Sequence, residues 1–290
     1  MSYDLSFAKI KGQPLSSRDI ISYLEAKIPA TIPEQGLRSD FNYHNENTGV
    51  YFFLELDEAD KVPVLMGFEH TGLSFNLSFM RPDFFGKEAF LFVKNLVADL
   101  NLFVLNPQGE EPDIPQKPNA QLLYEEWRVT NSKFAVNYFD DKCCYMSPEV
   151  TDFIWEYNLR RSLINEELGK EYFVPRVSYF RRAGSQEPIR VCAWAFPDPA
   201  VFPEVDYVVM GRLRKNWWGR ERMELGVVKF DTLLEQAGGL LAGFKESGCR
   251  ILPVQHAPAA MQALKGLEMD VTYKKWMEPL GMLHLQNYRP

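Results

Sequence analysis

The stretch LSFNLSF, residues 73–79, places an apolar side chain at every second position, with a polar side chain between each pair. The stretch VYFFLELD, residues 50–57, repeats this period, with apolar side chains at every second position from Val50. Successive side chains of a strand point to opposite faces, so the period predicts strands with one buried and one solvated face. Such half-buried strands are typical of antiparallel sheets. We therefore expect the first part of the chain to form an antiparallel sheet.

The segments around these two strands complete an expected unit over residues 1–107. Ser16 and Asp19 match a capping box, which predicts the start of a helix. The expected elements are, in chain order, a strand at 3–7, a helix after Ser16, strands at 41–43, 50–57 and 73–79, a helix at 87–101 and a strand at 102–105. This β-α-β-β-β-α-β order predicts one sheet with helices packed on one face.

Residues 108–120 differ in composition, because three prolines and three acidic residues fall among them. This predicts a linker or a surface loop between two units. A second unit is then expected over residues 121–290. Its expected elements are a helix from Ser147, strands at 173–180, 189–195, 205–213 and 224–230, a helix over 231–248, a strand at 250–254 and a helix at 259–264.

The fold class predicted from this pattern is α+β, with two antiparallel or mixed sheet units that each carry helices on one face. Both halves end in a helix followed by a short apolar strand. A duplicated fold explains this similarity, and so does the chance recurrence of α/β layers.

The composition restricts the class of protein. The chain has 290 residues, 46% of them hydrophobic, and a net charge of −7, which suits a globular, acidic protein. No secretory signal and no transmembrane segment are expected, because the N-terminus lacks a basic stretch followed by an apolar one and apolar runs are short. The four cysteines include no CxxC pair, so reduced thiols and a cytoplasmic location are expected.

No catalytic residue, metal site or cofactor is predicted. The four histidines, which are His44, His70, His256 and His284, are spread along the chain without metal-ligand spacing. Cys143 and Cys144 precede an expected helix, but the aspartates before them oppose thiolate formation. Glycine-rich phosphate loops and a GxSxG elbow are absent from the sequence.

Two charged clusters stand out. The first is an acidic patch of four carboxylates at Glu55, Asp57, Glu58 and Asp60, where the strand at 50–57 ends. A cation site or an acid–base pair is conceivable there, but a solvated strand end accounts for these residues more simply. A partner-binding acidic patch is the remaining interpretation.

The second cluster is basic and spans residues 212–222, where Asn216 and Gly219 predict the turn of a long hairpin. Arginine and tryptophan dominate the centres of protein interfaces and also suit phosphate binding and base stacking. A charged hairpin whose tryptophans pack on the core is the plainer interpretation. The residues that we predict as partner-binding are Arg212, Arg214, Lys215, Trp217, Trp218, Arg220 and Arg222.

Several phrases resemble a family of bacterial proteins encoded at polymorphic-toxin immunity loci. The phrases are MSYDLSF at 1–7, FMRPDFFGKEA at 79–89, NPQ at 106–108, FVPRV at 173–177 and PEVDY at 203–207. They consist of packing and turn residues, so the resemblance carries no functional residue over to this chain. It favours a role in protein binding, as in an immunity protein that occludes a cognate toxin, without identifying that toxin.

The leading hypothesis is therefore a cytoplasmic protein-binding module, with a toxin as the possible partner and no membrane partner. A nucleic-acid partner is disfavoured because the chain is acidic and has one basic cluster. An alternative is an enzyme with an active site between the two units, with Glu55, Asp57, His70 and His256 as candidates. A nucleic-acid-associated factor that uses residues 212–222 is the other alternative.

Overall fold

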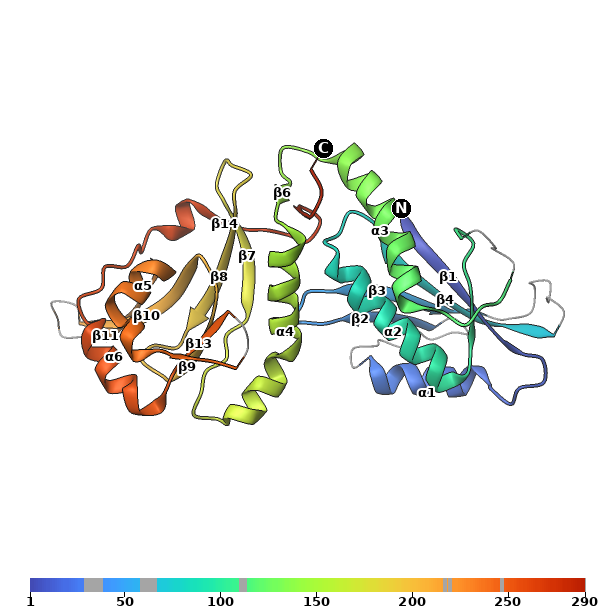
Figure 1. Cartoon of the computed structure of the whole chain (residues 1–290), viewed down its shortest axis with the longest axis horizontal. Coiled ribbons are helices and arrows are strands. Elements are labelled where there is room, and N and C mark those ends of the chain that lie inside the picture. Colours follow the sequence, from blue (N-terminus) through green and yellow to red (C-terminus); the bar gives the residue numbers. More distant parts are fainter. Residues whose placement is uncertain are drawn as a thin grey trace. The chain divides into compact units, whose positions relative to one another are not determined.

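The computed structural model contains six α-helices and fifteen strands within the residues that it describes, and it has the predicted α+β fold class (Figure 1). It divides into two compact units, residues 1–139 with 286–290 (unit 1) and residues 140–285 (unit 2). The described residues are 1–28, 39–57, 67–109, 114–215, 218, 221–245 and 248–289, with only the backbone described at 39 and 213–215.

Unit 1 is built on one five-stranded sheet with the strand order β2-β3-β4-β1-β5, in which all neighbours are antiparallel. Its elements are β1 (Ser2–Ile10), α1 (Ser17–Lys27), β2 (Ser39–His44), β3 (Tyr51–Leu56), β4 (Phe68–Ser78), α2 (Phe84–Leu100), β5 (Phe103–Leu105) and α3 (Ala120–Tyr138). The predicted β-α-β-β-β-α-β order is confirmed through β5.

The apolar face of this sheet is buried and the polar face is partly exposed. Leu73, Phe75 and Leu77 of β4 are each at most 1% exposed, and the polar residues between them remain half-buried. Phe90 of α2 packs against Tyr3 and Phe75 on the buried face. The two-residue period of the sequence therefore determines which face of the sheet the helix covers.

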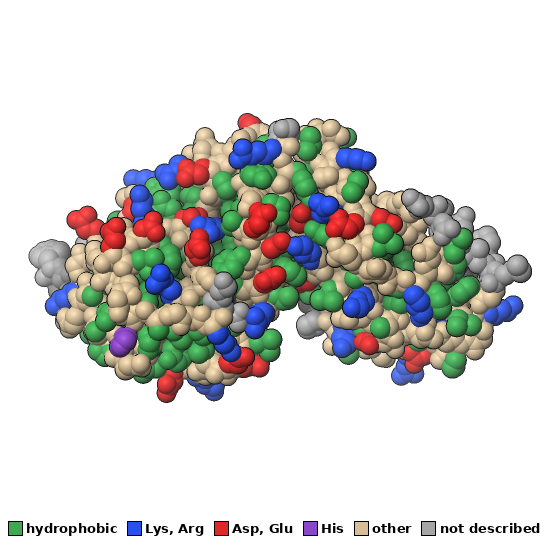
Figure 2. All heavy atoms as spheres, viewed as in Figure 1, with side chains coloured by type: hydrophobic (Ala, Val, Ile, Leu, Met, Phe, Trp, Pro, Cys, Tyr) green, Lys and Arg blue, Asp and Glu red, His purple; other side chains and the backbone are tan. Residues whose placement is uncertain are grey.

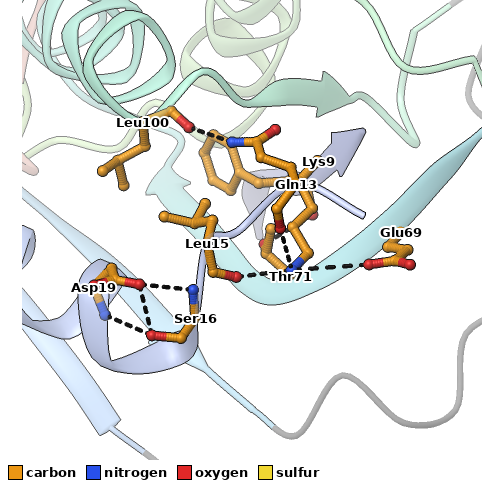
Figure 3. Close-up of polar contacts among 9 residues, drawn as sticks. Lys9, Gln13, Leu15, Ser16, Asp19, Glu69, Thr71 and Leu100 are labelled. Carbon is orange, nitrogen blue, oxygen red and sulfur yellow. Dashed lines mark hydrogen bonds and ion pairs between the residues drawn. The ribbon is translucent and has the colours of Figure 1, made fainter. Parts of the chain in front are cut away.

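The connection between β1 and α1 is held by the predicted capping box (Figure 3). The Ser16 hydroxyl accepts a hydrogen bond from the Asp19 backbone amide at 3.3 Å, and the Asp19 carboxylate accepts from the Ser16 amide at 2.8 Å. Lys9 donates to the carbonyls of Gln13 and Leu15 at 3.3 and 2.7 Å. These bonds fix where the chain leaves the sheet and enters the helix.

Helix α3 is absent from the sequence-based expectation, and it moves the boundary between the units. It lies beside α2 (Figure 1), and Gly86 of α2 lets the two helices approach closely. A Cβ at Gly86 would lie 2.5 Å from Trp127 Cε3 of α3. The described residues of the expected linker, 108–109 and 114–120, therefore lie within unit 1 rather than between the units, and the division falls at 139/140.

The last residues of the chain complete unit 1. Asn287 Oδ1 accepts a hydrogen bond from the Asp83 amide at 2.7 Å, at the start of α2, and the Tyr288 hydroxyl donates to the Asp83 carboxylate at 2.6 Å. The Asp83 side chain makes no capping bond of its own, so Asn287 satisfies an N-terminal amide of this helix. Nothing in the sequence pattern of residues 286–289 predicted this role.

Unit 2 contains a five-stranded mixed sheet of order β11-β10-β8-β7-β14, a three-stranded sheet of order β12-β13-β9 and the short pair β6 and β15. Its elements are β6 (Cys144–Tyr145), α4 (Pro148–Leu168), β7 (Val177–Arg182), β8 (Pro188–Trp194), β9 (Ala200–Pro203), β10 (Tyr207–Lys215), β11 (Glu221–Lys229), α5 (Phe230–Ala237), β12 (Ala242–Gly243), β13 (Cys249–Leu252), α6 (Ala257–Ala263), β14 (Met277–Pro279) and β15 (Leu285–Gln286), with 3-10 turns η1 (Gly238–Leu240), η2 (Val254–His256) and η3 (Tyr273–Lys275).

Two expectations for this half are corrected. The helix expected over 231–248 ends at Ala237, where Gly238 and Gly239 begin a 3-10 turn, because glycine is a poor helix former. The two units also differ in topology. β10 runs parallel to β8, whereas the sheet of unit 1 is wholly antiparallel, so the units are not copies of one strand arrangement.

No helix in the described part of the chain combines the length and the apolar character that crossing a membrane requires.

Candidate protein-binding surfaces

The β10–β11 hairpin, residues 207–229, extends beyond the sheet that carries it. The two strands pair over their whole length, from Tyr207 opposite Lys229 to Lys215 opposite Glu221. β10 pairs with β8 only as far as Met210. The outer half of the hairpin is therefore a two-stranded ribbon. The pairing of the two predicted strands is confirmed, whereas Asn216 and Gly219 of the predicted turn lie outside the described residues.

The predicted binding residues of this ribbon differ in their exposure and in their contacts. Arg212 is half-buried, and its Nη1 donates to the carbonyls of Lys265 and Leu267 at 3.2 Å each, so it holds the segment after α6. Arg222 is exposed, and Trp218 is 69% exposed. The side chains of Arg214 and Lys215, and all of Trp217 and Arg220, lie outside the described residues.

Two apolar residues that sequence reasoning missed lie on the same ribbon. Met223 is 55% exposed and Leu225 is 49% exposed, and both share the face of β11 that carries the buried Val227. Gly211 lies opposite Leu225, and a Cβ there would be 2.7 Å from Met223 Sδ, so the methionine covers the glycine. Met223 and Leu225 form what we call the edge stripe. Their alternation with Val227 resembles that of a core strand, which is why the sequence did not mark them as exposed.

The acidic patch is described at two of its four positions. Glu55 lies on the polar face of the sheet in unit 1, opposite Asp40 of β2 and Ser74 of β4, and Asp57 follows on the same face. Glu58 and Asp60 lie outside the described residues. Asp40 of β2 and Glu55 of β3 are two carboxylates directly opposite one another. Like charges in this position disfavour strand pairing unless water or a cation screens their repulsion.

The candidates for catalysis are divided between the two units. Glu55, Asp57 and His70 belong to unit 1, whereas His256 belongs to unit 2. Burial lowers the pKa of His70, which favours its neutral form. His256 Nδ1 lies 2.7 Å from the Leu240 carbonyl, so the ring donates its proton there and secures the turn after α5.

The four cysteines lie in the interior of the protein as free thiols. All four are buried and free of disulfide bonds. Burial raises the pKa of the Cys143 thiol, with a further contribution from Asp140, and burial also raises the pKa of Cys144. A nucleophilic cysteine needs a lowered pKa, so these two lack the property on which such catalysis depends.

Unit 2 also has an open pocket of about 890 Å³ between the start of β8, the start of α5 and the β12–β13 turn. Arg190 lies at its wall, and the guanidinium donates to Asp206 at 2.7 and 3.2 Å, with Glu204 3.6 Å from it. Two carboxylates therefore neutralise this arginine already. Exposed charges of both signs, including Lys229 and Asp231, complete the lining and select no single ligand charge.

The described residues contain no group of three or more histidine, cysteine or acidic side chains that could hold a metal ion. On the face shown in Figure 2, carboxylates and cations lie interspersed rather than separated by sign. Comparisons with models of known protein families, with curated proteins and with solved structures give no match to this chain.

Proposed function

We propose that this chain is a protein-binding protein that neutralises a cognate bacterial toxin by direct contact through the β10–β11 hairpin. The observation that supports this proposal is the edge stripe, in which Met223 and Leu225 are both about half exposed on a ribbon beyond the sheet. Contiguous exposed apolar residues rimmed by charge mark interaction sites in soluble proteins. The phrase-level resemblance to immunity proteins supports a toxin as the partner.

The charge of the hairpin supports an acidic partner surface. Residues 212–222 contain five cations and one carboxylate, in a chain whose net charge is −7. Opposite charge accelerates the encounter and orients the partner, and apolar contact then slows dissociation. A toxin bound there would be inhibited because the hairpin and its unit block access to its active surface. This mechanism requires no chemistry from the bound protein.

Coexpression tests the proposal. The chain would be produced together with the product of each neighbouring gene, and cell survival and copurification would be measured. We expect one neighbouring product to be toxic alone, tolerated with this chain, and recovered with it as a complex.

Two charge reversals assign the contact to the hairpin. Arg222→Glu should weaken the complex, whereas Lys170→Glu makes the same charge change at an exposed site of unit 2 outside the hairpin and should leave it unchanged. Failure of the chain to protect cells from any neighbouring product would refute the proposal. Salt-sensitive binding of DNA or RNA, lost in Arg222→Glu, would instead favour the nucleic-acid alternative.

A further inference from the structure

We propose that two copies of this chain pair through α3 in antiparallel orientation, with Leu122, Val129 and Val136 at the contact. We call these three residues the α3 stripe. The stripe lies in unit 1, whereas the hairpin of the proposed function lies in unit 2. The proposed pairing therefore adds a second interaction surface, and its test is separate from the test of toxin binding.

The α3 stripe is an apolar row on the outward face of its helix. Its members are seven residues apart, so each lies two turns further along the helix and only about 20° away around it. Their side chains are 52%, 48% and 38% exposed in chain order. The buried residues of α3, which include Trp127 and Asn131, are centred on the opposite side of the helix. The described part of the chain therefore leaves this apolar row in contact with water, as at an interaction site.

Glu126 lies beside the stripe and has one carboxylate oxygen to offer. Together with Ile114 and Leu122 it lines an open pocket of about 470 Å³. Its Oε2 accepts hydrogen bonds from the Tyr3 hydroxyl and from Asn106 Nδ2, at 2.7 Å each. Its Oε1 accepts from no described residue. The pocket beside Leu122 therefore presents an anion whose position is fixed and whose second oxygen is open to a cation.

Lys133 lies on the same side of the stripe, one turn after Val129. It is exposed, and it forms no ion pair with a described residue. None of the residues three or four positions away from it in α3 is acidic. On the other side of the stripe, Arg128 and Glu125 neutralise each other at 2.7 Å. One side of the stripe thus carries an anion and a cation that both lack a counter-ion.

A twofold axis beside Val129 brings these two charges together. In an antiparallel pair centred there, Leu122 of one copy meets Val136 of the other. Such an axis also sets the same side of both helices face to face, so Lys133 of each copy comes opposite Glu126 of the other. The lysine stem then lies along Leu122 and its ammonium reaches the pocket. By symmetry each of these contacts occurs twice.

A parallel pair would bring like charges together instead. Its twofold axis runs along the helices and sets opposite sides of the stripe face to face. Glu126 of each copy would then lie beside Glu125 of the other, and Lys133 would lie beside Ser132. Because like charges repel and opposite charges attract at such separations, the charges beside the stripe select the antiparallel orientation.

The helix thus carries both members of the ion pair that the contact needs, which favours a second copy as the occupant. Each copy has a net charge of −7, but a Debye length of about 8 Å at physiological ionic strength screens distant charges more than local pairs. α3 has 19 residues and is about 28 Å long, so a contact confined to it is small. We expect a weak dimer with a dissociation constant of about 1–100 μM.

Sedimentation equilibrium of the full chain, from about 1 μM to about 500 μM, tests the pairing. The mass of the unmodified chain should rise from monomer to dimer over this range. Lys133→Glu opposes two carboxylates at both charged contacts, and Glu126→Lys opposes two cations, so each should weaken the dimer at least about tenfold. An equimolar mixture of the two variants restores both attractions. It should form a heterodimer at least about tenfold tighter than either variant alone.

Two controls separate this surface from others. Lys170→Glu makes the same charge change as Lys133→Glu at an exposed site of unit 2 and should leave the dimer unchanged. Met223→Ser/Leu225→Ser alters the hairpin and should also leave it unchanged. A loss of the dimer in either control as large as in Lys133→Glu would contradict the assignment to α3.

Disulfide cross-linking determines the orientation and remains decisive if Glu126→Lys fails to fold. Val129 lies beside the proposed axis, so Val129→Cys should form a disulfide-linked dimer under copper-catalysed air oxidation. Position 122 lies about 21 Å along the helix axis from position 122 of the other copy. Leu122→Cys, at a similarly exposed site, should therefore stay monomeric. The four native cysteines are buried and do not compete.

Three results would overturn the proposed pairing: a monomer at every concentration, a mixture of folded charge variants no tighter than either alone, or equal cross-linking at positions 122 and 129. A monomeric chain whose Arg222→Glu variant still loses the toxin complex would refute the α3 pairing and leave the proposed function standing. A dimer with these properties that protects cells from no neighbouring product would refute the proposed function alone.

Discussion

At the scale of single residues, Glu88 places a carboxylate inside unit 1, where it is 5% exposed. Its Oε1 accepts hydrogen bonds from the Tyr43 hydroxyl at 2.8 Å, from Asn45 Nδ2 at 2.8 Å and from the Thr48 hydroxyl at 3.2 Å. One carboxylate on α2 thus joins β2 and the turn that follows it. Burial, together with the charge of Glu88, raises the pKa of Tyr43 and keeps it a donor.

Replacement of Glu88 tests this role. Glu88→Ala leaves three donors, of which Thr48 is buried and Tyr43 and Asn45 are half-buried, without their common acceptor, and we expect a loss of about 2–4 kcal/mol in the free energy of unfolding. Glu88→Gln keeps one acceptor oxygen and should cost about half as much. Urea denaturation measures both, and a loss under about 1 kcal/mol for the alanine variant would show that the donors find other partners.

The buried Cys192 thiol should make the free energy of unfolding depend on pH in the alkaline range. Burial raises its pKa from an ordinary value of 9.0 to about 12. Because the folded-state pKa is the higher one, the contribution is fully present below about pH 9 and is lost as the pH rises toward 12. We expect the free energy of unfolding to fall over this window and Cys192→Ala to show a smaller fall. Identical pH slopes for the two proteins would contradict this.

At the scale of elements, the crossing of α2 and α3 depends on a residue without a side chain. Gly86→Ala would place a Cβ 2.5 Å from Trp127 Cε3, and the tryptophan is fully buried. Overpacking of this kind typically costs about 1–3 kcal/mol. We expect Gly86→Ala to lower the melting temperature accordingly.

Gly239→Ala is a matched control, because a Cβ at position 239 meets nothing within 4 Å. Alanine restricts the unfolded chain at such a site, so a change within about 1 kcal/mol is expected. Equal melting temperatures for the two variants would show that α2 and α3 do not pack as closely as described.

The elements also show what the sequence could predict. β4 alternates without interruption, with Leu73 and Phe75 buried and Ser74 between them, so its faces were assigned correctly. α3 was missed because its pattern is mixed. Its buried positions include the polar Asn131, while Leu122 and Val129 are about half exposed. A helix whose apolar residues lie on both sides produces no clear helical period.

The candidate binding surface on the β10–β11 hairpin was also predictable only in part from the sequence. The hairpin was predicted because turn residues separate two strand patterns, and its cations are visible in the sequence. The edge stripe was not predicted, because the exposure of Met223 and Leu225 depends on where β10 stops pairing with β8, at Met210. Strand pairing between distant segments sets that limit, and no local pattern encodes it.

At the scale of the whole molecule, unit 1 is completed by residues from the end of the chain. Residues 286–290 belong to unit 1, although all of unit 2 separates them from residue 139 in the sequence. The Asn287 and Tyr288 bonds to Asp83 tie this segment to the start of α2. The covalent order of the chain therefore differs from its order in the fold, and composition alone could not reveal this.

Deletion of residues 286–290 should destabilise unit 1. We expect a loss of about 2–4 kcal/mol, because the α2 N-terminus and Asp83 both lose hydrogen-bond partners. Tyr288→Phe removes one of these bonds and should cost about 1–2 kcal/mol. Differential scanning calorimetry of both proteins provides the measurement, and unchanged unfolding after the deletion would show that the segment contributes nothing to stability.

The most direct test of the central claim is the affinity of this chain for the product of the neighbouring toxin gene. The unmodified chain, Met223→Ser/Leu225→Ser and Lys170→Glu would be titrated against that product by calorimetry. The account predicts that the double variant binds at least about tenfold more weakly and that Lys170→Glu binds like the unmodified chain. A double variant with unchanged affinity would show that the edge stripe is not the binding surface and would contradict the account.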